Sequence, residues 1–159
     1  MKTNIFFLLL ILCLFFSCEA PERDNPYDPE CPQEIWSPSN FQAVQDGTGI
    51  KLTWNSSNKN FDGFRITKRV NNGSSISLGD FSKSTNRFID INIIGGQQHV
   101  YTIYAFAGDN TSNSLNAEIT PILQASVLTD SPTLIGTKSA TFSGSITSNG
   151  GSQILERGF

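Results

Sequence analysis

The sequence is poor in the residues that most catalytic and metal sites use, with a single histidine and three cysteines among 159 residues. One histidine cannot supply a His-rich metal site. The sequence also lacks a G-x-x-x-x-G-K-[ST] phosphate loop and a G-x-S-x-G nucleophile elbow. The 11 basic residues are scattered and outnumbered by 14 acidic ones, unlike the basic stripe of a nucleic-acid-binding protein. We therefore expect no enzyme, no cofactor or metal, and no nucleic-acid partner.

No apolar run reaches the length of about 20 residues that a membrane-spanning helix needs. The longest run, "IFFLLLILCLFF", covers residues 5–16, follows Lys2 and ends just before Ser17 and Cys18. The apolar region of a secretory signal is about 7–15 residues long. Residues 1–17 are therefore predicted to be a signal peptide, and the protein is expected to be exported.

The pair Ser17-Cys18 at the end of this run resembles the lipobox of bacterial lipoproteins, although Phe15 stands where that family usually has leucine. The resemblance implies cleavage before Cys18 and a diacylglyceryl group on its thiol. Such acyl chains hold a protein on a membrane durably, and we expect a surface-exposed lipoprotein of the outer membrane. The alternative is ordinary signal cleavage nearby, which would leave Cys18 as a free thiol.

Residues 18–37 carry four of the seven prolines and six acidic side chains against one arginine. This composition predicts an extended, lipid-anchored acidic tether. Its segment "DNPYDPE", residues 24–30, resembles the "NP-[FY]-DP" tethers of Bacteroidota surface lipoproteins, and its prolines argue against a calcium loop. Cys31 is then the only free thiol, and it is either idle or available for an intermolecular disulfide.

From residue 38 the chain consists of short alternating runs separated by Gly, Asn and Ser, which is typical of an all-β sandwich. The tripeptide Asn71-Asn72-Gly73 supplies a tight hairpin turn. Trp54 is expected in the core. Seven strands are predicted, at residues 40–44, 50–54, 64–67, 76–78, 87–93, 99–107 and 115–122.

Residues 38–123 resemble a fibronectin type III domain, which has an immunoglobulin-like fold. The resemblance is carried by Pro38 and Phe41, by Trp54, by Phe64 and Ile66, and by "YTIYA" at 101–105. His99 replaces the family's corner tyrosine. The same hydrogen-bonding role is expected of its imidazole, in a structural position on a core strand.

Residues 124–159 resemble the start of a second, incomplete β-sandwich domain. Strands are expected at 127–135, at 142–146 and around Ile154 and Leu155, with a turn at Asn149-Gly150-Gly151. Three strands with an open edge bury too little surface for a stable domain. The sequence is therefore interpreted as a truncated fragment of a longer chain.

The expected function is binding, adhesion or display at the bacterial surface without catalysis, with a polysaccharide or an envelope protein as partner. The alternative is a spacer region of a surface hydrolase that degrades glycans. Candidate ligand contacts are Tyr104, Asp109 and Asn110, and Trp36, which either stacks on a sugar or covers the bottom of the sandwich.

Overall fold

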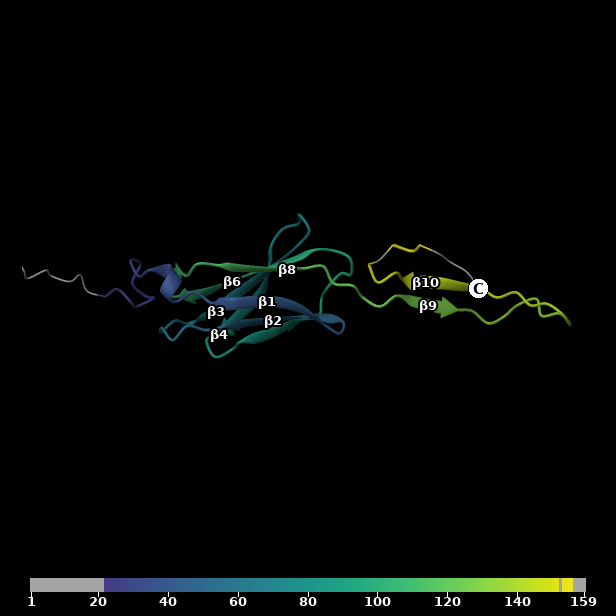
Figure 1. The fold of residues 1–159 in the computed structure, drawn as a ribbon, viewed down its shortest axis with the longest axis horizontal. Helices are drawn as coiled ribbons and strands as arrows, with labels where there is room; N and C mark the ends of the chain where they lie inside the picture. Colours follow the sequence, from purple (N-terminus) through teal and green to yellow (C-terminus); the bar gives the residue numbers. More distant parts are fainter. Residues whose placement is uncertain (1–21, 152, 156–159) are drawn as a thin grey trace, which may run out of the picture.

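The computed structural model describes residues 22–151 and 153–155. The expected signal peptide and Cys18 lie outside these residues. Within the described part the chain forms strands, turns and one short 3-10 helix, η2 (Gln33–Ile35), and contains no α-helix (Figure 1). The all-β fold class is confirmed.

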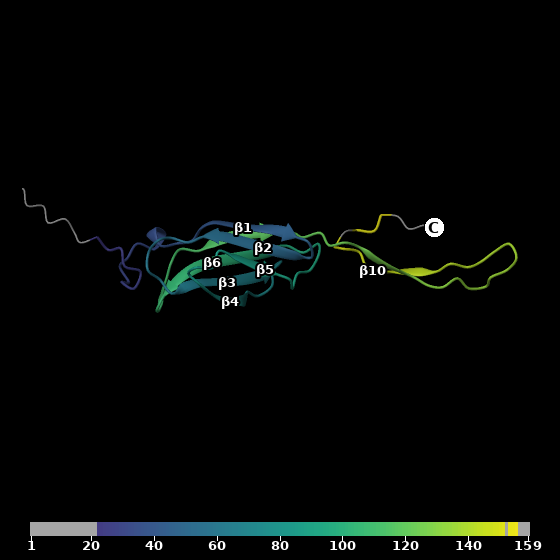
Figure 2. The ribbon, with the colours of Figure 1, turned by 90° about the horizontal axis from the view of Figure 1, so that it is seen from below.

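Two antiparallel sheets face each other, as Figure 2 shows. The first has the order β1-β2-β5, and its strands are β1 (Ser39–Asp46), β2 (Gly49–Asn55) and β5 (Arg87–Asp90). The second has the order β4-β3-β6, and β6 also pairs with β7 and β8. Its strands are β3 (Gly63–Val70), β4 (Ile76–Ser82), β6 (His99–Ala107), β7 (Asn110–Thr111) and β8 (Leu115–Ile119).

All seven expected strands are present, and β7 is a two-residue addition in the expected polar loop. β5 ends at Asp90, short of the predicted residue 93, because the Asp90 carboxylate turns the chain by accepting a hydrogen bond from the Asn92 N–H at 3.0 Å. β8 ends at Ile119, just before Pro121, which has no N–H to donate to a ladder.

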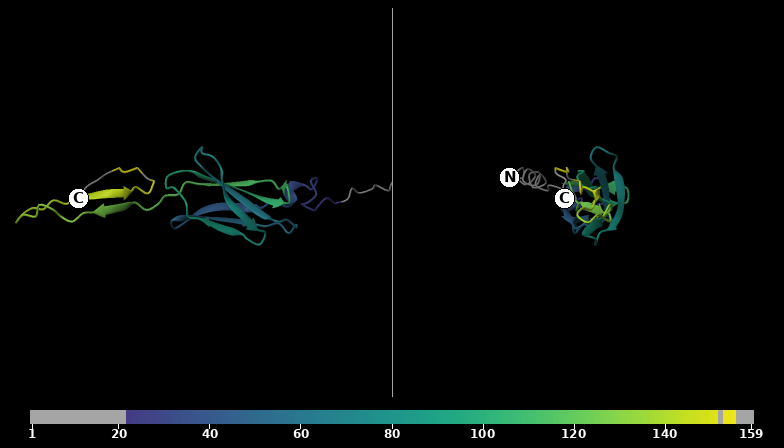
Figure 3. Two further views of the ribbon diagram at one scale, coloured as in Figure 1. Left: turned by 180° about the vertical axis from the view of Figure 1, so that it is seen from behind. Right: turned by 90° about the vertical axis from the view of Figure 1, so that its right-hand side faces the viewer.

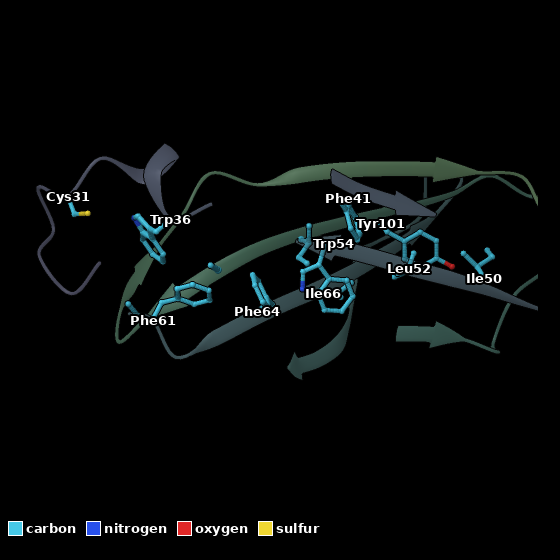
Figure 4. Packing of buried hydrophobic residues seen from close by; sticks show 13 residues of the cluster. Cys31, Trp36, Phe41, Ile50, Leu52, Trp54, Phe61, Phe64, Ile66 and Tyr101 are labelled. Carbon is cyan, nitrogen blue, oxygen red and sulfur yellow. The ribbon is translucent and has the colours of Figure 1, made fainter. Parts of the chain in front are cut away.

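The core lies between the sheets because inward and outward side chains alternate along each strand. On β2, Ile50, Leu52 and Trp54 point inward, and on β6 Tyr101, Ile103 and Ala105 do so. Figure 4 shows Trp54 in the middle of this cluster. His99 is fully buried, and its Nε2 lies 3.2 Å from both the N and the O of Ile94. It thus makes the expected hydrogen bond to a nearby loop.

The C-terminal part forms a hairpin of β9 (Ser126–Thr129) and β10 (Gly144–Ser148). β9 is shorter than the strand predicted at 127–135, and β10 is shifted by two residues from the strand predicted at 142–146. Residues 153–155 form no strand, so the prediction of a third strand is wrong for these residues. The large apolar side chains of the hairpin are exposed, namely Val127, Leu128, Leu134, Ile135, Phe142 and Ile146. A two-stranded hairpin has no second layer to cover them.

Two glycine pairs meet where this hairpin joins the sandwich. A Cβ on Gly150 would overlap the Leu123 carbonyl, and a Cβ on Gly96 would overlap the backbone of Gly151. Leu123 N donates to Gly150 O and Gly96 N donates to Pro121 O, both at 2.8 Å. The hairpin extends from this joint at the end of the sandwich opposite the N-terminal segment (Figure 3).

Candidate functional site

The N-terminal segment, residues 22–37, is folded onto one end of the sandwich, which we call the N-terminal pole. Two side chains turn it locally, since Asn25 Oδ1 accepts from Tyr27 N at 3.2 Å and Asp28 Oδ1 accepts from Glu30 N at 2.9 Å. Pro26 is fully buried and Cys31 is buried. The expected extended tether is therefore wrong for residues 22–37, because Asn and Asp next to proline form compact turns.

Asp62 is the centre of this docking. Its Oδ1 accepts from the Tyr27 hydroxyl at 2.7 Å, and its Oδ2 accepts from the Gly108 N–H at 2.8 Å. The Gly108 hydrogen bond, followed by the Tyr27 bond, lowers the pKa of Asp62, and the bond to Asp62 raises the pKa of Tyr27. One carboxylate thus joins the N-terminal segment to the turn after β6.

Two further contacts hold the segment. Asn110 Nδ2 donates to Pro26 O at 3.0 Å, and Lys59 Nζ lies 2.9 Å from Asp24 Oδ2. The lysine, through its hydrogen bond and its charge, lowers the pKa of Asp24. One acidic side chain of the segment, Asp24, and one backbone carbonyl, that of Pro26, therefore accept hydrogen bonds from the sandwich.

Trp36 closes the N-terminal pole. Only 1% of its surface is exposed, and its ring centroid lies 6.3 Å from that of Phe61. Figure 4 shows Trp36 between Cys31 and Phe61. Of the two roles open for Trp36, the structure places it as the cover of the sandwich, with no free face for a sugar. Burial, as the main cause, raises the pKa of the Cys31 thiol, and a buried thiol is poorly placed for an intermolecular disulfide.

The other candidate contacts do not converge on one site. Asp109 is exposed on the turn after β6, while the amide of Asn110 is committed to the N-terminal segment. Tyr104 is half-buried on the outer face of β6 and pairs in register with Arg65. The Arg65 guanidinium binds both oxygens of Asp80, at 2.6 and 2.7 Å, and this pair raises the pKa of Arg65.

A different group of polar side chains lies together on the sheet of β1, β2 and β5. Together with the core residue Trp54 they line an open depression of about 390 Å³, and they are Asn40, Gln42, Thr53, Asn55, Asn86 and Arg87. Gln42, Thr53 and Arg87 form one cross-strand row. The left-handed backbone of Asn40, with φ of 53°, lies at the bulge in β1. Sequence reasoning missed this site because its residues come from three separate segments.

The polar side chains around this depression are free to bind a ligand, as far as the described residues show. In the described part of the chain, the side chains of Asn40, Gln42, Thr53, Asn55, Asn86 and Arg87 make no hydrogen bond or ion pair with another residue. Four carboxamides can each donate and accept, and Arg87 donates through a planar fork. The depression, called here the amide depression, can bind a polar ligand by hydrogen bonds.

Sequence reasoning also missed a buried ion pair. Lys68 Nζ lies 2.7 Å from Asp90 Oδ2, and the two side chains are 4% and 3% exposed. The only available signal was that Lys68 occupies the third inward position after Phe64 and Ile66 on β3. The Tyr101 hydroxyl donates to the same Asp90 oxygen at 2.8 Å.

Within the described residues, no three His, Cys, Asp or Glu side chains are grouped to hold a metal ion. Among those same residues, none forms a helix with the length and apolarity to cross a membrane.

Comparison with solved structures defines the class of the sandwich. The chain superposes on a two-domain fibronectin type III segment of chicken tenascin with a TM-score of 0.56 and 19% identity, over 68% of this chain and 61% of that one. A fibronectin type III-like protein from Clostridium thermocellum is also similar, with a TM-score of 0.45 and 18% identity over 55% of this chain and 95% of that one. No family model and no curated protein match the sequence.

These likenesses show the fold alone, because the identities are below 20%. The protein contains a fibronectin type III-like β-sandwich. The function of a domain with this fold has to be argued from its site.

Proposed function

We propose that this protein is a non-enzymatic lipoprotein of the bacterial outer membrane, anchored through a diacylglyceryl group on Cys18, which displays a fibronectin type III-like domain at the cell surface for binding. The apolar run at 5–16 and the pair Ser17-Cys18 support the anchor. The sandwich fold and the unused polar groups of the amide depression support a binding role.

The docking of residues 22–37 onto the N-terminal pole of the sandwich is the observation that supports the display role. Three residues separate Cys18 from Glu22, where the described chain begins. Four steps of extended chain span at most about 14 Å. A lipid on Cys18 therefore holds the N-terminal pole close to the membrane surface and leaves the other end of the sandwich pointing outward.

The anchor is tested by changing Cys18→Ala and separating detergent and aqueous phases after expression in a bacterial host. The wild-type protein is expected in the detergent phase and the variant in the aqueous phase, because the acyl chains supply the affinity. Cys13→Ala is the matched control, since it removes a thiol from the same apolar run and leaves partitioning unchanged. Retention of the Cys18→Ala protein in the detergent phase contradicts lipidation.

The ligand proposed for the amide depression is a polysaccharide. Carboxamides match the paired donor and acceptor character of sugar hydroxyls. Arg87 is the only charged side chain lining the depression, and its guanidinium favours a sugar that bears a carboxylate. An acidic polysaccharide is therefore expected to bind more tightly than a neutral one.

Affinity electrophoresis tests this ligand class, with polygalacturonate or dextran cast into native gels. We expect polygalacturonate to retard the wild-type protein and the double change Asn86→Ala, Arg87→Ala to abolish most of the retardation. Asn60→Ala, an exposed amide outside the depression, serves as the control and should migrate like the wild type. Equal migration of the double variant and the wild type excludes this depression as the site.

A further inference from the structure

The buried pair Lys68 and Asp90 joins the two sheets of the sandwich. Lys68 lies on β3 and Asp90 ends β5, and these strands belong to different sheets. Both side chains point into the core, where Ile50 is the register partner of Asp90. Figure 4 shows the hydroxyl of Tyr101 on the Ile50 side of the cluster. This is an unusual place for two formal charges, because burying an ion pair costs desolvation energy that the attraction often fails to recover.

Hydrogen-bond donors surround the carboxyl group of Asp90, as they would surround a carboxyl group that is attacked by an amine. Its Oδ1 accepts from the Asn92 N–H at 3.0 Å, and its Oδ2 accepts from the Tyr101 hydroxyl at 2.8 Å and from Lys68 Nζ at 2.7 Å. The backbone carbonyl of Asn92 accepts a second bond from Lys68 Nζ at 2.7 Å. The Lys68 amine is thus held within hydrogen-bonding distance of the carboxyl group that it would attack, and reacting atoms held about 3–3.5 Å apart gain most from such positioning.

We propose that Lys68 and Asp90 condense to an amide, which covalently joins β3 to the end of β5. A proton first passes from the ammonium group of Lys68 to the Asp90 carboxylate, which removes both charges from the apolar core. The free amine then attacks Cγ. The Asn92 N–H stabilises the negative charge that develops on Oδ1, as an oxyanion-hole donor does.

The condensation balances without any further reactant. When the tetrahedral intermediate collapses, the bond between Cγ and Oδ2 breaks and Oδ2 leaves as hydroxide. The tyrosine hydroxyl donates its proton to the departing Oδ2 and receives one from the attacking nitrogen, so Tyr101 is unchanged. The products are one secondary amide and one water molecule, and no atom is oxidised or reduced.

The surroundings of the pair favour the linked state. The amide keeps one N–H, which the Asn92 carbonyl can accept, and one carbonyl oxygen, which the Asn92 N–H can bind. Two buried charges are thereby replaced by a neutral group with both of its partners in place. The bond closes a loop of the chain from residue 68 to residue 90, which adds stability by restricting the unfolded state.

Peptide mass mapping of the full-length chain, purified from membranes, tests this proposal. Trypsin cleaves after Arg65, Arg69, Arg87 and Lys138 but not after an acylated Lys68. We expect one branched product that joins residues 66–69 to residues 88–138, lighter than the sum of the two peptides by one water, about 18 Da. Recovery of residues 66–68 and 88–138 as separate peptides from the folded wild-type protein overturns the proposal.

Two variants on the same strand separate the chemistry from folding. Tyr101→Phe keeps the ring but removes the proton donor, so we expect the branched peptide to appear at least tenfold more slowly after pulse-labelled synthesis of the protein. Tyr104→Phe, on the outer face of β6, is the matched control and should link at the wild-type rate. Equal rates for both variants overturn the role given to Tyr101, and a branched peptide in a Lys68→Met protein shows that another residue supplies the amine.

Discussion

Trp54 connects the two sheets through aromatic contacts with three neighbours. Its ring centroid lies 6.5 Å from that of Phe41, 5.7 Å from that of Phe64 and 6.0 Å from that of Phe81. Only 2% of its surface is exposed. Its importance follows from this position, because a large aromatic side chain that contacts rings of both sheets buries much apolar surface.

We predict that Trp54→Ala lowers the free energy of unfolding by about 3–5 kcal/mol, because it leaves a cavity that the surrounding rings cannot fill. Urea denaturation measures this change. Ile76→Ala, on a half-exposed residue of β4, is the control and should cost less than about 0.5–1 kcal/mol. A loss below about 1 kcal/mol for Trp54→Ala contradicts its central position in the core.

Asp62 makes the docking of the N-terminal segment sensitive to acid. Its pKa lies below the ordinary value of 3.8 because the Gly108 N–H and then the Tyr27 hydroxyl bind its charged form. A carboxyl group with a lowered pKa in the folded state stabilises that state above its unfolded pKa. We therefore predict that docking is at full strength above pH 3.8 and is lost as the pH falls below that value.

The Gly108 amide proton, observed by NMR, is the direct probe of this titration. Its chemical shift should move in a single step centred below pH 3.8 in the wild-type protein. In Tyr27→Phe the step should shift toward the ordinary value, since one of the two donors is gone. An Asp62→Asn protein should show no step, and a persisting step in that variant assigns the titration to another group.

At the residue scale, the sequence predicted inward positions well and polar partners poorly. Trp54, Ile50 and Leu52 are core residues as alternation indicated. Lys68 has the same alternating position, but a lysine there is normally taken as an outward residue at a shifted register. Its burial depends on Asp90 and Tyr101, which are 22 and 33 residues away in sequence (90 − 68 and 101 − 68).

At the element scale, the positions of the strands were predictable where alternation was regular. The strands of the sandwich follow from runs of inward apolar residues between turn residues. The N-terminal segment was not predictable in this way, because its docking depends on partners in distant loops. Lys59 and Asn110 donate hydrogen bonds to the segment, and Asp62 accepts one from Tyr27. Composition reports the prolines and charges of a segment but not the partners that a fold offers them.

The joint between the sandwich and the β9–β10 hairpin depends on glycine at specific positions. We predict that Gly150→Ala breaks it, because the new Cβ meets the Leu123 carbonyl. The hydrogen bond from Leu123 N to Gly150 O should then open more often. Amide hydrogen exchange at Leu123 is expected to accelerate by at least about tenfold, equivalent to about 1.4 kcal/mol.

Gly47→Ala is the matched control for this change. Gly47 has a φ of 60°, close to the 65° of Gly150, but nothing lies within 4 Å of its added Cβ. Both variants therefore carry the same backbone strain, and only Gly150→Ala adds a steric overlap. Similar exchange rates at Leu123 in the two variants would assign the effect to backbone strain alone.

At the scale of the whole molecule, the sandwich has two unlike ends. The N-terminal pole carries residues 22–37, Asp62 and the turn at 108–110, and the opposite end carries the turn at 71–73 and the glycine joint. β6, nine residues long, runs from one end to the other and spans about 30 Å. The proposed anchor therefore places these ends at different distances from the membrane.

We predict that a fluorophore at Asp109→Cys is quenched several-fold more by quencher-labelled lipid headgroups than one at Asn72→Cys. The lipidated protein is reconstituted into vesicles for this measurement, and the buried Cys31 is not expected to react with the label. The same labels on the Cys18→Ala protein, which should stay in solution, give the baseline. Equal quenching at both positions contradicts a membrane-proximal N-terminal pole.

The docked N-terminal segment also determines the direction in which a pulling force acts on the strands of the sandwich. The chain enters β1 at the N-terminal pole and leaves β8 toward Pro121 at the opposite end, so a pull on the outer end runs lengthwise along both strands. Hydrogen bonds between antiparallel strands lie perpendicular to that direction. The load is therefore shared in shear by whole ladders at once, whereas a pull across the strands would peel bonds one at a time. With the proposed anchor, the domain acts as a stiff tether between the membrane and a partner bound at its outer end.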